Sequence, residues 1–165
     1  MYVTSQYVLV TEDGGHSFTA ISPDLTRNDP KTTGDTGGPI TKDQTGAEVY
    51  ATIFTFSEAP TEQGVLWTGS DDGYIHVSKN NGASWDKVNI PTSMLPEFSL
   101  ISIIHTSEHT KGKAYVAANK YMYGDRAPYL FKTTDYGKTW KKLTAGIPAA
   151  VFCRASREDA NKSSK

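Results

Sequence analysis

Two stretches of the sequence carry side chains that could do chemistry. Asp71 and Asp72 are adjacent in GSDDG. Asp125 follows Tyr121 and Tyr123 in NKYMYGDRAP, a stretch that we expect to form a long loop at 119–128. Hydrolysis of a glycosidic bond needs two carboxyl groups about 5–9.5 Å apart, one of which has a raised pKa. We therefore treat Asp72 and Asp125 as candidate catalytic residues, provided that the fold brings the two stretches together.

The same stretches, with one further segment, could instead bind a ligand without reacting with it. Aromatic rings stack on sugar rings and charged groups bind hydroxyls, so tyrosines beside charged residues suit a glycan. The candidate ligand-binding residues are Asp71, Tyr121, Tyr123, Arg126, Asp29 and Arg27. In the alternative interpretation the tyrosines pack against the protein, Asp125 pairs with Arg126, and the segment around Asp29 is a solvated loop.

Other classes of site lack the residues that they require. The four histidines have no metal-like spacing and Cys153 is the single cysteine, so we expect neither a metal centre nor an internal disulfide. No glycine-rich phosphate loop and no GxSxG motif occurs, so no cofactor is predicted. Lysine and arginine are scattered at a net charge of −1, which disfavours a nucleic-acid partner, and no stretch is apolar enough to span a membrane.

A repeated eight-residue turn organises the rest of the sequence. It reads TEDGGHSF at 11–18, SKNNGASW at 78–85 and TTDYGKTW at 133–140, and we call each copy a box. Runs of β-branched and aromatic residues flank each box, and the similarity extends upstream to give four runs per unit. Units of about 40–50 residues with four strands are typical of propeller blades. The prediction is an all-β chain, a β-propeller-type array of about three four-stranded antiparallel blades.

The box residues are typical of a tight hairpin rather than of a reactive site. Asp or Asn at the third position can accept hydrogen bonds from backbone N–H groups ahead of it, and Gly at the fifth allows a backbone conformation that a side chain would penalise. The aromatic residue at the eighth position is expected to return to the apolar layer. We predict structural roles for the box residues Asp13, Gly15, Phe18, Asn80, Gly82, Trp85, Asp135, Gly137 and Trp140.

The expected strands divide the chain into units. Residues 1–24 form a partial first blade, 25–47 a long inter-blade loop, 48–95 the second blade, 96–150 the third, and 151–165 an orphan first strand with a polar tail. Three blades are too few to close a ring, since propellers have about 4–8. The chain is then part of a larger propeller, or half of a homodimer in which each last strand completes the partner's first blade to make a six-bladed ring.

The boxes resemble the Asp-box, or BNR, repeat of sialidases, xyloglucan-type endoglucanases and the sortilin-type receptor ectodomain. The flanking sequences ISPDLTRNDP and LWTGSDDGYIHVSKNNGASWDKV resemble secreted propellers of this group, which are described as glycosyl hydrolase-like or sortilin-like. The resemblance implies a ligand site on the face opposite the boxes and an extracytoplasmic location, although the sequence MYVTSQYVLV has no signal-peptide pattern. It does not fix the activity, because the same repeat occurs in enzymes and in receptors.

The expected function is a binding module that is glycan-directed and glycoside hydrolase-like by resemblance. Two alternatives stay open at this point: an active glycoside hydrolase that uses a carboxylate pair opposite the boxes, and a non-catalytic sortilin-like scaffold that binds a peptide or protein. A true sialidase would need an arginine cluster for the substrate carboxylate. The sequence has only Arg27, Arg126, Arg154 and Arg157, so we do not expect sialidase activity.

Overall fold

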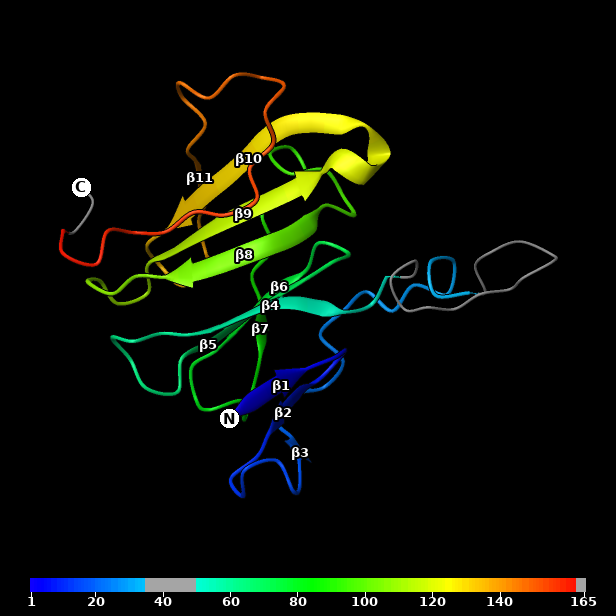
Figure 1. Ribbon diagram of the computed structural model, residues 1–165, viewed down its shortest axis with the longest axis vertical. Helices are drawn as coiled ribbons and strands as arrows, with labels where there is room; N and C mark the ends of the chain where they lie inside the picture. Colours follow the sequence, from blue (N-terminus) through cyan, green and yellow to red (C-terminus); the bar gives the residue numbers. More distant parts are fainter. Residues whose placement is uncertain (35–49, 163–165) are drawn as a thin grey trace.

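The computed structural model describes residues 1–34 and 50–162, and these form three antiparallel sheets (Figure 1). The first sheet consists of β1 (Tyr2–Thr4), β2 (Val8–Val10) and β3 (Thr19–Ala20). The second consists of β4 (Ile53–Glu58), β5 (Leu66–Ser70), β6 (Ile75–Ser78) and β7 (Asp86–Lys87). The third consists of β8 (Leu100–Thr106), β9 (Ala114–Lys120), β10 (Asp125–Thr133) and β11 (Lys141–Lys142). Consecutive strands are neighbours in every sheet, which confirms the predicted all-β architecture of blade-like meanders.

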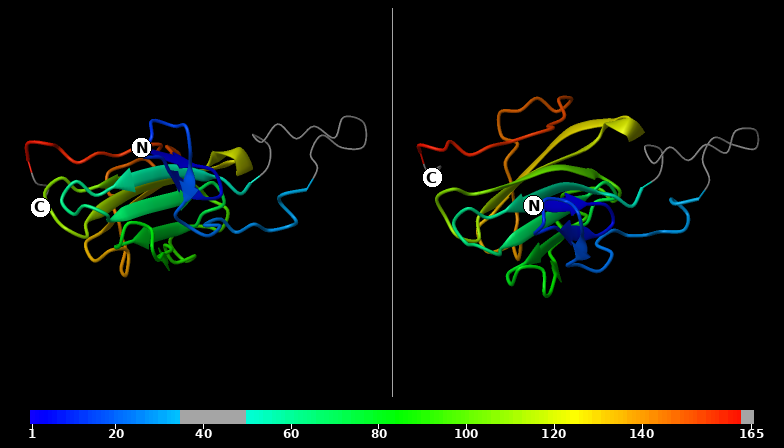
Figure 2. Two further views of the ribbon diagram at one scale, coloured as in Figure 1. Left: turned by 90° about the horizontal axis from the view of Figure 1, so that it is seen from below. Right: turned by 60° about the horizontal axis from the view of Figure 1, so that its bottom comes forward.

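The three sheets follow one another with their first strands, β1, β4 and β8, next to each other (Figure 2). Hydrogen bonds join these inner strands. The Ile53 N–H donates to the Ser5 carbonyl at 2.7 Å, and the Ile104 N–H donates to Thr55 Oγ1 at 3.1 Å. Successive sheets are therefore fixed to each other at the inner edge.

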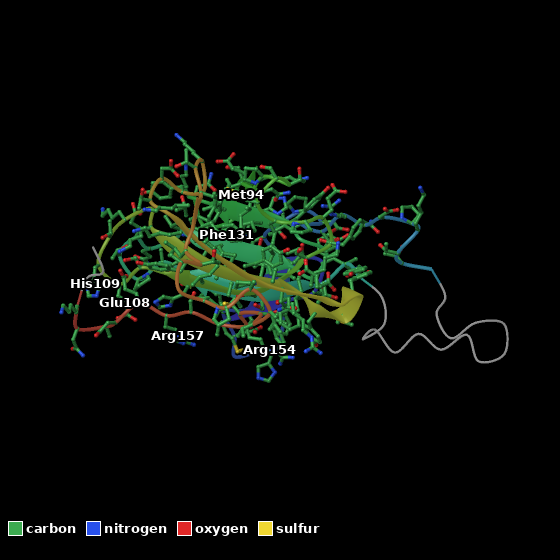
Figure 3. The ribbon with its side chains drawn as sticks, turned by 90° about the horizontal axis from the view of Figure 1, so that it is seen from above. Met94, Glu108, His109, Phe131, Arg154 and Arg157 are labelled. Carbon is green, nitrogen blue, oxygen red and sulfur yellow. The ribbon has the colours of Figure 1, made fainter. Side chains whose placement is uncertain are left out.

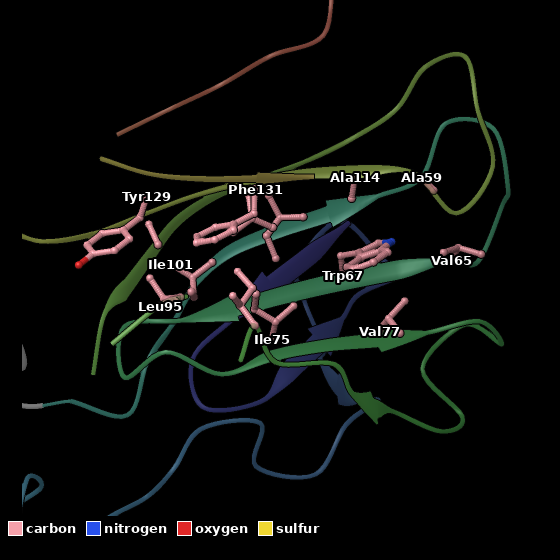
Figure 4. Close-up of a cluster of buried hydrophobic side chains, with 14 residues drawn as sticks. Ala59, Val65, Trp67, Ile75, Val77, Leu95, Ile101, Ala114, Tyr129 and Phe131 are labelled. Atoms are coloured by element: carbon pink, nitrogen blue, oxygen red, sulfur yellow. The ribbon is translucent and has the colours of Figure 1, made fainter. Parts of the chain in front are cut away.

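The apolar core lies in two layers between the sheets. The larger layer, between the second and third sheets, includes Trp67 and Phe131, which are at most 1% exposed (Figure 4). The smaller layer, between the first and second sheets, is built on Val8, Leu25 and Ile53. β5 and β6 are buried along their whole length because a neighbouring sheet covers each of their faces, so they lack the polar alternation of a half-exposed strand.

Each box closes on itself with the same set of hydrogen bonds. In the first box, Asp13 Oδ1 accepts from the Ser17 N–H (2.9 Å) and the Thr11 hydroxyl (2.7 Å), and the Gly15 N–H donates to Thr11 Oγ1 (2.9 Å). The other two boxes repeat this pattern. The hydrogen bonds from Ser17 hold the pKa of Asp13 well below its usual range, because they favour the ionised carboxylate.

The second and third boxes also contact the sheet before them. The Trp85 indole N–H donates to the Ile21 carbonyl at 2.9 Å, and the Trp140 indole N–H donates to the Val88 carbonyl at 3.0 Å. Ile21 follows β3 and Val88 follows β7, so both indoles reach the same place on the preceding sheet. Phe18 has no described sheet before it and is 44% exposed, which differs from the expectation that it returns to an apolar layer.

The fifth-position glycines of the second and third boxes lie in this contact between sheets. A Cβ at Gly82 would come within 2.7 Å of the Ile21 carbonyl oxygen, and a Cβ at Gly137 would come within 2.7 Å of the Val88 side chain. A Cβ at Gly15, in the first box, would meet nothing closer than 3.8 Å. All three glycines have positive φ, so what separates Gly15 from the other two is the approach of the preceding sheet.

Several expected segments differ from the structure. The long loop expected at 119–128 is a hairpin, because its extra residues extend β9 and β10 and only the 3-10 turn η1 (Tyr121–Tyr123) and Gly124 lie between them. The strand expected at about 150–156 does not form in the described structure. An innermost strand needs a ladder partner, and no described segment pairs with it in this way. Of the expected loop 25–47, residues 35–47 lie outside the described residues, and the unit boundaries stay a prediction.

We predict that Gly82→Ala and Gly137→Ala destabilise the protein more than Gly15→Ala does. All three changes place a side chain at positive φ, which costs on the order of 1–3 kcal/mol. The first two also press a methyl group against the preceding sheet, and this adds about 1–3 kcal/mol. Urea unfolding followed by tryptophan fluorescence gives the three free energies of unfolding. Equal losses in the three variants would show that the boxes do not hold the sheets together.

His76 makes the stability of the fold depend on pH. It lies buried in β6 opposite Thr68 of β5, and its Nδ1 has no hydrogen-bond partner among the described residues. Burial, assisted by the charge of Lys87, lowers the pKa of His76 from 6.5 to about 4. The unfolded chain takes up a proton at His76 below pH 6.5, whereas the folded chain does so only near pH 4. The free energy of unfolding therefore falls by roughly 3 kcal/mol across this window.

His76→Gln should remove this part of the acid sensitivity. Urea unfolding of both proteins near pH 7 and near pH 4.5 gives the loss of stability on acidification, which should be smaller in the variant by about 2–3 kcal/mol. Burial also lowers the pKa of His105. Because both proteins contain His105, its contribution to the loss of stability on acidification cancels when the two losses are compared. The same loss in both proteins would contradict the assignment.

Candidate functional site

The boxes and the candidate residues lie at opposite ends of the sheets. In the second box, the Asn81 N–H donates to the Gly64 carbonyl in the β4–β5 turn at 3.0 Å. In the third box, the Tyr136 N–H donates to the Gly112 carbonyl in the β8–β9 turn, also at 3.0 Å, so the boxes lie at the same end of the sheets as these turns. Successive turns of a meander alternate between its two ends, so the β5–β6 turn and η1 lie at the other end (Figure 1). We call this other end, with residues 22–34 and 89–99, the site face.

Asp72 anchors the chain segment that follows the first sheet. It is 1% exposed, and its Oδ1 accepts from the Ser70 hydroxyl at 2.5 Å. The Arg27 N–H donates to Asp72 Oδ2 and the Arg27 Nε–H donates to the Asp72 carbonyl, each at 2.8 Å. Both carboxylate oxygens thus face donors of the same chain, which favours an anchoring role over a catalytic one.

The guanidinium of Arg27 is held between two aromatic rings. Its Cζ lies 4.6 Å from the centroid of the Tyr74 ring and 4.5 Å from that of Phe98, and Nη1 lies 3.4 Å from Glu97 Oε1. Lys87 Nζ lies 3.2 Å from the centroid of the same Tyr74 ring. A cation over a ring face is worth about 0.5–2 kcal/mol depending on its exposure, so these contacts hold Arg27 in one position.

Stacking and hydrogen bonds continue from Phe98 to the third sheet. The Tyr50 ring lies 5.6 Å from the Phe98 ring, and the Tyr50 hydroxyl donates to the Tyr123 hydroxyl at 2.6 Å. Lys120 Nζ lies 5.2 Å from the centroid of the Tyr123 ring. Burial and the hydrogen bond with Tyr123 raise the pKa of Tyr50 above its usual range, so its hydroxyl stays neutral. We call Arg27, Tyr74, Phe98, Tyr50, Tyr123 and Lys120 the aromatic–cation row.

The sequence identified only Arg27 and Tyr123 of this row. Tyr74 follows the GSDDG turn directly and Phe98 lies in the link before β8, so a search for aromatic residues at the ends of strands would have included both. Tyr50 and Lys120 carry no comparable sequence signal, because their place in the row depends on how the second and third sheets meet.

Asp125 forms a local pair with a tyrosine of its own strand. Its Oδ1 accepts from the Ala127 N–H at 2.8 Å and its Oδ2 from the Tyr129 hydroxyl at 2.7 Å. The hydrogen bond from Tyr129 lowers the pKa of Asp125, whereas a general acid for glycoside hydrolysis needs a raised one. Burial and the bond to Asp125 raise the pKa of Tyr129 to about 12.

The other candidate residues have separate surroundings. Asp71 Oδ1 accepts from the Ala51 and Thr52 N–H groups at 3.1 and 2.9 Å, and burial raises the pKa of Asp71. Asp29 Oδ1 accepts from the Lys31 N–H at 2.9 Å within its own turn. Arg126 is exposed on β10. Asp71 and Asp29 thus stabilise local backbone, and among the described residues no hydrogen bond or ion pair joins either of them to Asp125.

The two tyrosines of η1 differ in how open they are. Tyr123 is 60% exposed, and its ring is the open end of the aromatic–cation row. The Tyr121 ring stacks on Phe152 with centroids 5.1 Å apart, and the Arg154 guanidinium lies 5.2 Å from its centroid. Phe152 and Arg154 therefore contact one of the candidate ligand-binding residues and leave its ring partly exposed.

The described residues show no cluster of three or more His, Cys, Asp or Glu side chains that could hold a metal ion. Among the same residues, no helix is long and apolar enough to cross a membrane. The contacts described on the site face join aromatic rings, cations and hydrogen-bonding groups.

Comparison with protein families finds no family model that matches the chain. Vacuolar protein sorting/targeting protein 10 of Colletotrichum graminicola (strain M1.001 / M2 / FGSC 10212) is 29% identical over 89 residues. The match covers 53% of this chain and 5% of that protein, so the chain spans a small part of that relative.

Among solved structures, YCF48 bound to D1 peptide is similar with a TM-score of 0.50 and 15% identity, over 82% of this chain and 33% of that chain. YCF48 from Cyanidioschyzon merolae has a TM-score of 0.42 and 16% identity, over 64% of this chain and 29% of that chain. The chain thus spans about one third of the YCF48 chain. The first of these similarities and the three meander sheets show a fold of β-propeller-type blades.

Proposed function

We propose that this chain is a protein- or peptide-binding module whose ligand lies on the site face, over the aromatic–cation row. The observation that carries the proposal is the row itself. Its side chains come from residues 27, 50, 74, 98, 120 and 123, and stacking and hydrogen bonds hold them in place before any ligand arrives. Rigid aromatic and arginine side chains supply much of the binding energy at protein interfaces.

The carboxylates of the site face support binding over hydrolysis. Asp72 is enclosed by donors of its own chain, and the pKa of Asp125 is lowered by Tyr129. A hydrolase needs one free carboxylate and one protonated carboxyl group close together, and neither residue meets that requirement as it stands.

The similar proteins support the choice of ligand class. YCF48 was solved bound to D1 peptide, and the fungal relative is a protein sorting/targeting protein. The proposal extends peptide binding to this chain, together with the extracytoplasmic location implied by its resemblance to secreted propellers, which cell fractionation would check. We also infer that the boxes are Asp-box repeats, because all three share one pattern of hydrogen bonds; a box that tolerates loss of its Asp or Asn would oppose this.

A glycan is the second candidate ligand. The observation in its favour is the exposed ring of Tyr123 beside Lys120, which suits stacking on a sugar. An active glycoside hydrolase is a further proposal, and it requires rearrangement around Asp72 and Asp125. A two-fold dimer also stays a proposal, and light scattering that reports only the 18.0 kDa monomer would contradict it.

We predict that peptides selected on the full chain bind through the aromatic–cation row. A displayed random peptide library is selected on immobilised protein, and calorimetry measures the affinity of the enriched peptides. Tyr123→Ser and Lys120→Ala should each weaken binding by about tenfold or more, because both residues form the open end of the row. Lys138→Ala, a matched change in the third box, should have no effect.

Two results would overturn the proposal. The first is a set of enriched peptides whose affinity is the same for all variants. The second is a failure to enrich any peptide, combined with binding to a glycan array that Tyr123→Ser abolishes, since this result would assign the row to a glycan.

A further inference from the structure

Residues 150–159 cross the outward face of the third sheet, the face turned away from the second sheet (Figure 1). The segment forms no strand there. The Ser102 hydroxyl of β8 donates to the Arg154 carbonyl at 2.7 Å, and Nε2 of His109, in the β8–β9 turn, lies 2.8 Å from the Asp159 carbonyl. Figure 3 shows Arg154, Arg157 and then His109 in order along this side of the molecule.

One side chain of the segment is fully buried, and it is charged. The Glu158 side chain has no exposed surface and the Lys113 side chain is 4% exposed, with Lys113 Nζ 2.5 Å from Glu158 Oε1. The Tyr115 hydroxyl donates to the same oxygen at 3.3 Å, and the Ser107 hydroxyl donates to Oε2. Ser107 and Lys113 of the β8–β9 turn and Tyr115 of β9 thus surround the carboxylate.

A second anchor lies six positions before Glu158. The Phe152 ring stacks on Tyr121 at an interplanar angle of 19°, and the Arg154 guanidinium lies over the same ring. Among residues 150–162 only Glu158 is buried. The segment is therefore held at two points by side chains, with a mostly exposed stretch between them, which is how an extended peptide is commonly bound.

Residues 150–159 occupy the position on the third sheet that the third sheet occupies on the second. On the second sheet, Ser57 Oγ lies 2.9 Å from Thr106 Oγ1 of the next sheet, whereas on the third sheet the corresponding Ser107 contacts Glu158. Residues 150–159 thus lie on the third sheet where the next sheet lies on the second, and Glu158 is the one buried residue among them. Segments with few buried contacts open at a low cost in free energy compared with the core.

We propose that the outward face of the third sheet is a groove for an extended peptide that carries an aromatic residue and, six positions later, a carboxylate. Residues 150–159 are its resident occupant and give way to such a peptide from a partner protein. The carboxylate is required, because a peptide without it would leave the buried Lys113 facing a neutral group. This groove is separate from the aromatic–cation row, so its test does not depend on the proposed function.

The test uses the full chain and a fluorescent peptide that copies residues 150–162 with serine in place of Cys153. Glu158→Ala weakens the resident segment, so the peptide should bind this variant about tenfold or more tightly than the wild type in fluorescence anisotropy. The same peptide with glutamine at the Glu158 position should bind about tenfold or more weakly. Glu108→Ala, which removes a neighbouring exposed acid, should bind like the wild type.

A second measurement covers the case in which Glu158→Ala does not fold. Saturating peptide added to the wild type should speed hydrogen exchange of the amides of residues 152–158 and leave those of the second sheet unchanged. Unchanged exchange in the wild type, or a folded Glu158→Ala variant that does not bind the peptide, overturns the proposal. A stable dimer that free peptide does not dissociate also overturns it, because the groove then belongs to a second copy of the chain.

Discussion

The arrangement of this protein depends on one contact, the hydrogen bond from a box tryptophan to the backbone of the preceding sheet. Trp85 and Trp140 each donate to the first carbonyl after the outer strand of that sheet. The glycine three positions earlier in each box removes the Cβ that would otherwise collide with the same segment. Within the box, the Asp or Asn side chain accepts hydrogen bonds from the hairpin backbone and so stabilises the turn itself. The second and third boxes therefore both close a hairpin and fasten it to the preceding sheet.

The boxes lie at one end of the sheets, and the aromatic–cation row that we propose as the ligand site lies at the opposite end. The Asp and Asn side chains of the boxes accept hydrogen bonds from their own hairpins, and the tryptophan contacts join successive sheets. Side chains from separate parts of the chain then meet at the site face, where Arg27 lies between Tyr74 and Phe98 and Tyr50 reaches Tyr123. Such a surface binds by being preorganised, since its side chains lose little freedom when a ligand arrives.

Much of the fold could be predicted from the sequence because its signals are local. The box pattern fixes a hairpin, the spacing of the boxes fixes the repeat, and apolar runs such as Leu66–Ser70 fix strands that are covered on both sides. The candidate site was less predictable, because it depends on contacts over long separations. The bond from Arg27 to Asp72 spans 45 residues and that from Tyr50 to Tyr123 spans 73. Sequence alone indicated free carboxylates at Asp72 and Asp125, since nothing local reveals that Arg27 and Tyr129 hold them.

Hydrogen exchange of the indole N–H groups tests the central contact directly. The chain has three tryptophans, and Trp67, buried in the core, serves as the protected reference. Their signals in a proton–nitrogen correlation spectrum can be assigned with Trp85→Phe and Trp140→Phe. If the boxes fasten the sheets, the indole protons of Trp85 and Trp140 exchange with D2O about a hundredfold or more slowly than free indole. Exchange of both at the rate of free indole, with Trp67 still protected, would contradict the account.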